Sequence, residues 1–153
     1  MGGILKYLSF QGRANRKRFW LTTLSLFGLF LVSSLIVMGV TAASPFLSLI
    51  VVPFWLAFLV ASVANGARRL HDRNKSAWWL LLFSGLPTLL AIPYELAKYG
   101  PPDDFQLAAA ALAALGLPFS IWGFIVVGCL KGTTGPNRFG DDPLSQPLEE
   151  TFA

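Results

Sequence analysis

Four long apolar runs alternate with shorter polar segments along the 153-residue chain. The runs cover residues 19–40, 46–64, 78–97 and 105–130, and the first contains no charged residue. About 20 consecutive apolar residues are enough for a helix to cross the hydrocarbon core of a bilayer. We therefore expect an all-α membrane protein, with a four-helix transmembrane bundle as its membrane domain, residues 19–131.

Prolines interrupt the second half of this pattern. Pro87 and Pro93 lie in the third run and Pro118 in the fourth, so each is expected to break or bend its helix. Gly116 and Ser120 are four residues apart, and small residues at such a spacing allow two helix backbones to approach closely. Alanine-rich filler without any packing role is an equally good interpretation of that stretch.

The opening segment, residues 1–18, is basic. Arg13, Arg16, Lys17 and Trp20 fall at i, i+3, i+4 and i+7, which is one face of a helix. This spacing predicts a short N-terminal helix lying in the membrane interface. A cleaved signal peptide also begins with basic residues, but its apolar region covers only about 7–15 residues. We therefore expect the first run to be a retained helix.

Composition and charge agree with a membrane protein. Hydrophobic residues make up 54% of the chain and charged residues only 13%, and the mean hydropathy is +0.59. All but one of the 12 Lys and Arg residues lie in residues 1–18, in the segment between the second and third runs, or from Lys131 onward; the exception is Lys98. The positive-inside rule then places both termini in the cytoplasm. This asymmetry explains the pI near 9.6 without a nucleic-acid partner.

The segment Asn65–Trp79 is the most polar interval between apolar runs, and we expect it to be a cytoplasmic loop. It contains the only histidine, His71, beside Asp72. His71 is a candidate acid or base because histidine titrates near neutral pH. Adjacent side chains on a helix point apart, so Asp72 is instead expected to pair with Arg68 at i, i+4.

Metal ligation is not expected in this segment. Its four cations would repel a divalent ion, and the one cysteine, Cys129, cannot form a cysteine-based zinc site or an internal disulfide. We predict neither a metal nor a cofactor.

Anion binding suits the basic residues better. Arginine forks match phosphate and carboxylate groups, and anionic lipid headgroups are the nearest such anions for a membrane protein. The competing interpretation is that these cations only set the topology. We define the polar cap as the residues expected to meet at the cytoplasmic face, which are Arg13, Arg16, Arg68, Arg69, His71, Asp72 and Asn137.

Three stretches together resemble a known family. They are Phe10-Gln-Gly-Arg-Ala-Asn-Arg-Lys-Arg-Phe-Trp20, Ala67-Arg-Arg-Leu-His-Asp72 followed by Ser76-Ala-Trp-Trp79, and Gly132 to Pro143 with Pro136-Asn-Arg-Phe-Gly140 inside it. The third stretch belongs to the polar tail, residues 132–153. The chain is similar to the bacterial inner-membrane family called "domain of unknown function 805". The resemblance implies a small multi-spanning protein with no assigned activity. Two departures are Ala77, where members often carry glycine, and Phe139, where they often carry tyrosine.

We expect a non-enzymatic inner-membrane protein whose polar cap docks a partner or binds anionic headgroups. The arginines would meet the anion, Asp72 would orient Arg68, and Asn137 would fix the tail. Membrane lipids, a second membrane protein or another copy of the chain are the expected partners. One alternative is a membrane enzyme acting on a lipid or small anionic metabolite through His71. A channel or carrier is a second alternative, disfavoured because no ionisable residue lies deep in a run.

Overall fold

The computed structural model describes residues 8–43, 52–100 and 103–145. Within those residues all regular elements are helices, and no strand occurs. In chain order they are α2 (Arg16–Ala43), α3 (Val52–Asp72), the π-helix η2 (Leu81–Gly85), α4 (Leu86–Ala97), α5 (Asp103–Ala114), α6 (Leu117–Gly123) and the π-helix η3 (Phe124–Cys129). The chain divides into two compact units. Unit 1 combines residues up to Asn74 with those from Gly132 onward, and unit 2 is Lys75–Lys131.

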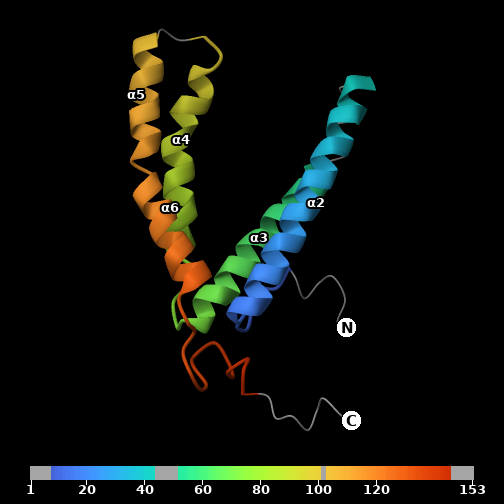
Figure 1. Ribbon diagram of the computed structural model, residues 1–153, viewed down its shortest axis with the longest axis vertical. Coiled ribbons are helices and arrows are strands. Elements are labelled where there is room, and N and C mark those ends of the chain that lie inside the picture. Colours follow the sequence, from blue (N-terminus) through green and yellow to red (C-terminus); the bar gives the residue numbers. More distant parts are fainter. Residues whose placement is uncertain (1–7, 44–51, 101–102, 146–153) are drawn as a thin grey trace. The chain divides into compact units, whose positions relative to one another are not determined.

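In unit 1, α2 and α3 lie side by side (Figure 1). Phe30 of α2 holds them together, because its ring lies 5.1 Å from the ring of Trp55 and 5.5 Å from that of Phe58. Nearer the start of α2, the Asn65 side chain donates hydrogen bonds to the carbonyl of Phe19 and the hydroxyl of Thr23, at 3.2 and 3.1 Å. The hairpin is therefore fixed by aromatic contacts along its length and by polar contacts near one end.

The expected N-terminal interfacial helix is wrong for residues 9–15, which are not helical. The backbone of Gly12 has φ +83°, a left-handed conformation that a right-handed helix excludes. Helix α2 starts only after Asn15, whose side-chain oxygen accepts the N–H of Arg18 at 2.9 Å and so caps the first turn. Residues 1–7 lie outside the described part of the chain.

The expected loop Asn65–Trp79 is also wrong in its first half, because α3 continues through Asp72. The first part of the expected second span, residues 46–51, lies outside the described residues. A helix end rich in polar groups is stable only when those groups find partners. Buried side chains occupy much of this end of α3, namely Asn65, Arg68, Arg69 and Asp72.

Unit 2 is a pair of interrupted helices, and α4 packs against α5 (Figure 1). The π-helical turn η2 ends just before Pro87 and a non-helical turn just before Pro118, as expected, since α4 and α6 each have a proline in their first turn. The break expected at Pro93 is wrong, because Pro93 lies inside α4. Of the two interpretations left open for the stretch around Gly116, the structure shows the close approach, because a Cβ there would lie 2.9 Å from the Cα of Pro87. Gly123 is equally constrained, with a Cβ position 2.5 Å from the Cβ of Phe83.

Burial in the chain is inverted relative to a water-soluble protein. Among the described residues, the largest fully buried side chains are Arg69 and Leu70, whereas Leu35 and Met38 of α2 are 67% and 68% exposed. Two helical stretches are long and apolar enough to cross a membrane, Arg16–Gly39 and Asp103–Cys129, and Leu81–Ala97 is a shorter apolar helix. Apolar side chains that face outward need lipid around them. The four-span arrangement stays a prediction.

Candidate functional site

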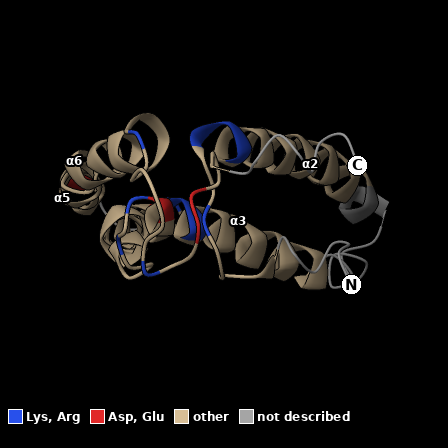
Figure 2. Cartoon of the chain, turned by 90° about the horizontal axis from the view of Figure 1, so that it is seen from below, with Lys and Arg blue, Asp and Glu red and all other residues tan. Residues whose placement is uncertain are grey.

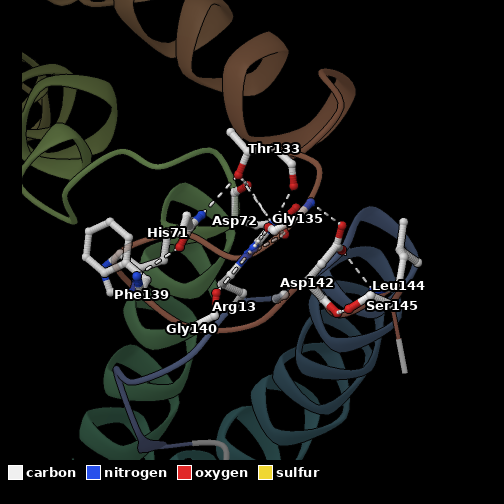
Figure 3. Close-up of polar contacts among 12 residues, drawn as sticks. Arg13, His71, Asp72, Thr133, Gly135, Phe139, Gly140, Asp142, Leu144 and Ser145 are labelled. Atoms are coloured by element: carbon white, nitrogen blue, oxygen red, sulfur yellow. Dashed lines mark hydrogen bonds and ion pairs between the residues drawn. The ribbon is translucent and has the colours of Figure 1, made fainter. Parts of the chain in front are cut away.

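Arg13 lies at the centre of the polar contacts of unit 1 (Figure 3). Its Nε donates to Oδ1 of Asp72 at 3.2 Å. Its two terminal nitrogens donate to backbone carbonyls of the tail, Nη1 to Gly135 at 2.7 Å and Nη2 to Thr133 at 2.6 Å. The Arg13 side chain is only 1% exposed. One guanidinium group therefore joins the N-terminal segment, the end of α3 and the polar tail.

Asp72 lies between two arginines. Its Oδ1 is 3.1 Å from Nη2 of Arg13, and its Oδ2 forms a close ion pair with Nη1 of Arg69, one helical turn earlier. We call Arg13, Arg69 and Asp72 the arginine clasp. The expected Arg68–Asp72 pair is wrong, because Nε of Arg68 donates instead to the carbonyl of Ala64 at 3.2 Å. Each carboxylate oxygen of Asp72 therefore forms an ion pair with a guanidinium group that is almost fully buried.

The polar tail donates hydrogen bonds to carbonyl groups at the C-terminal end of α3. The N–H and hydroxyl of Thr133 both donate to the carbonyl of Asp72, at 2.8 and 3.0 Å. The amide of Asn137 donates to the carbonyl of His71 at 3.0 Å. These contacts satisfy carbonyls that the helix end leaves without partners. Gly132 must be glycine for the tail to pass, since its Cβ would lie 2.0 Å from Oδ2 of Asp72.

His71 is held by stacking. Its ring lies parallel to that of Phe139, with centroids 3.9 Å apart, and the Arg138 guanidinium is 4.7 Å from the Phe139 ring. Nδ1 of His71 is 3.3 Å from the carbonyl oxygen of Gly12. Burial lowers the pKa of His71, and the positive charge of Arg138 lowers it further, against the opposing effect of Gly12. With the Asp72 carboxylate held by arginines, no His71–Asp72 dyad forms.

Three further basic residues of the opening segment, Arg16, Lys17 and Arg18, are exposed. Arg16, Lys17 and Arg18 form the first turn of α2, and the rest of that helix carries no charge (Figure 2). Arg16 is close enough to Arg69 for its charge to lower the pKa of Arg69, although burial is the larger cause. In the part of the chain that the structure describes, no three His, Cys, Asp or Glu residues gather as a metal site would require.

The structure thus divides the polar cap. One network of contacts joins five of its residues, which are Arg13, Arg69, His71, Asp72 and Asn137. The Arg68 side chain instead donates to a carbonyl of its own helix, and the Arg16 side chain is exposed.

Several residues of the motif stretches, to which residue chemistry alone assigned no role, complete this network through backbone groups or close packing. They are Ala14, Gly132, Thr133 and Gly135. Their contributions come mainly from main-chain atoms or the lack of a side chain, which residue chemistry does not reveal. The only signal available was that the three motifs occur together in one chain.

These features define a small, all-helical membrane protein whose distant segments are joined by buried ion pairs. Residues 7–141 match the family described as "Protein of unknown function (DUF805)", and the chain belongs to this family. It is 29% identical over 140 residues to the inner membrane protein YhaI of Escherichia coli K12, covering 90% of this chain and 87% of that protein.

A second relative has a similar level of identity. The inner membrane protein YhaH of E. coli K12 is 30% identical over 151 residues, covering 92% of each chain. No solved structure matches the chain. The family resemblance carried by the three motifs is confirmed, and the chain is an integral membrane protein related to inner-membrane proteins.

Proposed function

We propose that this protein is a non-enzymatic, four-span inner-membrane protein that binds anionic lipid headgroups at its cytoplasmic face, through the exposed first turn of α2 beside the polar cap. The observation that carries the proposal is the division of the basic residues. Arg13 and Arg69 are buried in ion pairs with Asp72, whereas the Arg16–Arg18 turn is exposed at one end of an uncharged helix. In this proposal the buried arginines hold the cap in shape, and the exposed cations meet the anion.

The position of the exposed cations favours headgroups as the anion. α2 contains a 24-residue apolar stretch that begins at Arg16, so its first turn would lie where a spanning helix enters the membrane surface. The positive-inside rule puts that turn on the cytoplasmic side, with both termini. Anionic lipids of that leaflet attract nearby cations by about 1 kcal/mol for each Lys or Arg. Three cations in one turn therefore favour anionic over neutral lipid on the order of 100-fold.

An enzymatic role for His71 receives less support from the geometry. A general base needs access to the proton that it removes, and often a carboxylate that orients it. The His71 ring is stacked on Phe139, and the neighbouring carboxylate of Asp72 faces two arginines.

The test compares bound lipids in a variant that removes the three cations. The protein and its Arg16→Gln/Lys17→Gln/Arg18→Gln variant are reconstituted in nanodiscs of phosphatidylglycerol and phosphatidylethanolamine. Native mass spectrometry then counts the lipids retained on release. We expect the variant to lose its preference for phosphatidylglycerol.

Lys98→Gln is the matched control, because Lys98 is also exposed but lies near the end of α4 and already pairs with Glu95. This control should keep the preference of the unmodified protein. Equal retention of phosphatidylglycerol by the triple variant and the unmodified protein would overturn the proposal.

A further inference from the structure

A cavity of about 720 Å³ lies between α2 and α3 in unit 1. This volume is within the range of about 300–1,000 Å³ that is usual for pockets holding small organic ligands. On α2 its wall includes Thr22, Ser25 and Leu29, and on α3 it includes Phe54, Ala57 and Ala61. We call this cavity the α2/α3 groove. None of the arginine clasp residues lines it.

Small side chains lie on both sides of the groove, and larger ones form the rest of its wall, namely Leu8, Leu21, Leu26, Leu29, Phe54 and Phe58. Ala57 and Ala61 are four residues apart and so share a face of α3. Thr22 and Ser25 of α2 line the same cavity, and none of these four side chains is long enough to fill it. The larger Phe54 and Leu29 lie further along their helices from the charged turn. The sequence therefore leaves an open channel next to the charged turn of α2.

One end of the groove is polar and the other is apolar. Asn15, Lys17 and Arg18 line the end at the start of α2, and Leu29 marks the other. From Arg18 to Leu29 the helix rises about 16 Å, at about 1.5 Å per residue. A single leaflet contributes about 15 Å to the hydrocarbon core, half of its total thickness. The length of the groove along α2 is therefore close to the thickness of the hydrocarbon layer of one leaflet. Its positively charged end lies where the headgroup of a lipid would be.

The charged side chains at this end are available to a ligand. Lys17 and Arg18 are exposed, and neither side chain makes an ion pair with any described residue. A phosphate placed between them gains two cationic partners, which is the arrangement that binds phosphate in proteins. A soluble anion would use the cations but not the apolar walls, and a neutral lipid would use the walls but not the cations.

We propose that the α2/α3 groove is a binding site for one anionic phospholipid, with the phosphate between Lys17 and Arg18 and an acyl chain along the groove. This inference rests on the proposed headgroup-binding function and adds a specific, stoichiometric site to it. The occupant is a lipid rather than a partner helix because the groove combines two exposed cations, which make no ion pair among the described residues, with an apolar wall about one leaflet long.

The experiment fills the groove without touching its charges. Ala57→Phe places a ring in the groove from α3, and Ser25→Leu fills it from α2. Two variants are used so that the test still gives a result if one of them fails to fold. Both positions are exposed side chains that line the cavity. Ala108→Phe, at an exposed alanine of α5, is the matched control for added bulk. Each protein is titrated with phosphatidylglycerol in detergent and followed by native mass spectrometry.

We expect one tightly held phosphatidylglycerol in the unmodified protein and in the Ala108→Phe control. Its affinity should fall about tenfold or more in both groove variants, the effect of losing two buried methylene groups. Glycerol phosphate, which lacks acyl chains, should not compete for the site.

The outcomes separate this inference from the proposed function. If the triple-cation variant loses the preference for anionic lipid but filling the groove changes nothing, headgroup binding stands and the groove site is refuted. If neither set of variants changes lipid retention, both are refuted. Competition by glycerol phosphate, or replacement of the lipid by a second copy of the chain, would also refute the groove as a phospholipid site.

Discussion

Asp72→Asn is the substitution that tests the arginine clasp most directly. Asparagine has nearly the same shape as aspartate, so the change opens no cavity and removes only the negative charge. Arg13 and Arg69, with side chains 1% and 0% exposed, would then face each other with no anion between them. Buried charges without a counterion are strongly unfavourable.

The expected magnitude follows from this burial. Removing one partner of a buried ion pair costs about 3–5 kcal/mol, because the remaining charge stays desolvated. At about 1.4 kcal/mol for each factor of ten, the equilibrium for release of the polar tail should shift by roughly 100- to 4,000-fold. The tail should open first, since Arg13 holds it through the carbonyls of Thr133 and Gly135.

Limited trypsin digestion in mild detergent measures this opening. Arg138 lies in the tail and is exposed, and release of the peptide that follows it reports access to the opened tail. Glu95→Gln is the control, because it neutralises a carboxylate whose pair with Lys98 is 63% and 51% exposed. Exposed pairs contribute about 0–1 kcal/mol, so this control should digest like the unmodified protein. Digestion of Asp72→Asn within about twofold of the control would refute the clasp as the element that holds the tail.

Two further predictions concern the same contacts. Gly132→Ala should release the tail about as strongly as Asp72→Asn, because its Cβ would lie 2.0 Å from the carboxylate, whereas Gly28→Ala, with nothing within 4 Å, should be neutral in the same digestion. The pKa of His71 is below its usual value in the folded protein, so stability should be greatest above about pH 6.5 and decline as the pH falls through the folded pKa. Thermal unfolding at pH 7.5 and 5.5 should show this decline, and His71→Asn should reduce it; an unchanged pH dependence in the variant would assign the decline to other groups.

The helices and their interruptions were predictable from the sequence. An apolar run is a local property, and a proline lacks the N–H that a helix interior uses, so Pro87 and Pro118 marked the interruptions of unit 2. Pro93 did not, because it lies inside α4. The close approach at Gly116 was one of two interpretations that the sequence left open. The family was also predictable, since the three motifs are short contiguous strings.

The pairing of charges was not predictable. Helical spacing allows Asp72 two partners on its own helix, Arg68 at i−4 and Arg69 at i−3, and the expected pair with Arg68 was the wrong one. The choice depends on Arg13, which is 59 residues away and occupies the other carboxylate oxygen. The N-terminal helix was wrong for residues 9–15 for the same reason, because contacts with α3 and the tail hold this part of the segment before α2.

The sequence alone determined which segments are apolar and helical and which are basic, because hydropathy and charge are properties of individual residues. It could not separate Arg13 and Arg69 from Lys17 and Arg18, since all four are cations beside apolar runs. Tertiary structure decided which of them are buried against a carboxylate and which stay exposed beside a groove. The physical reason is that desolvation and pairing depend on which distant segments meet, and unit 1 brings together the N-terminal segment, the end of α3 and the polar tail.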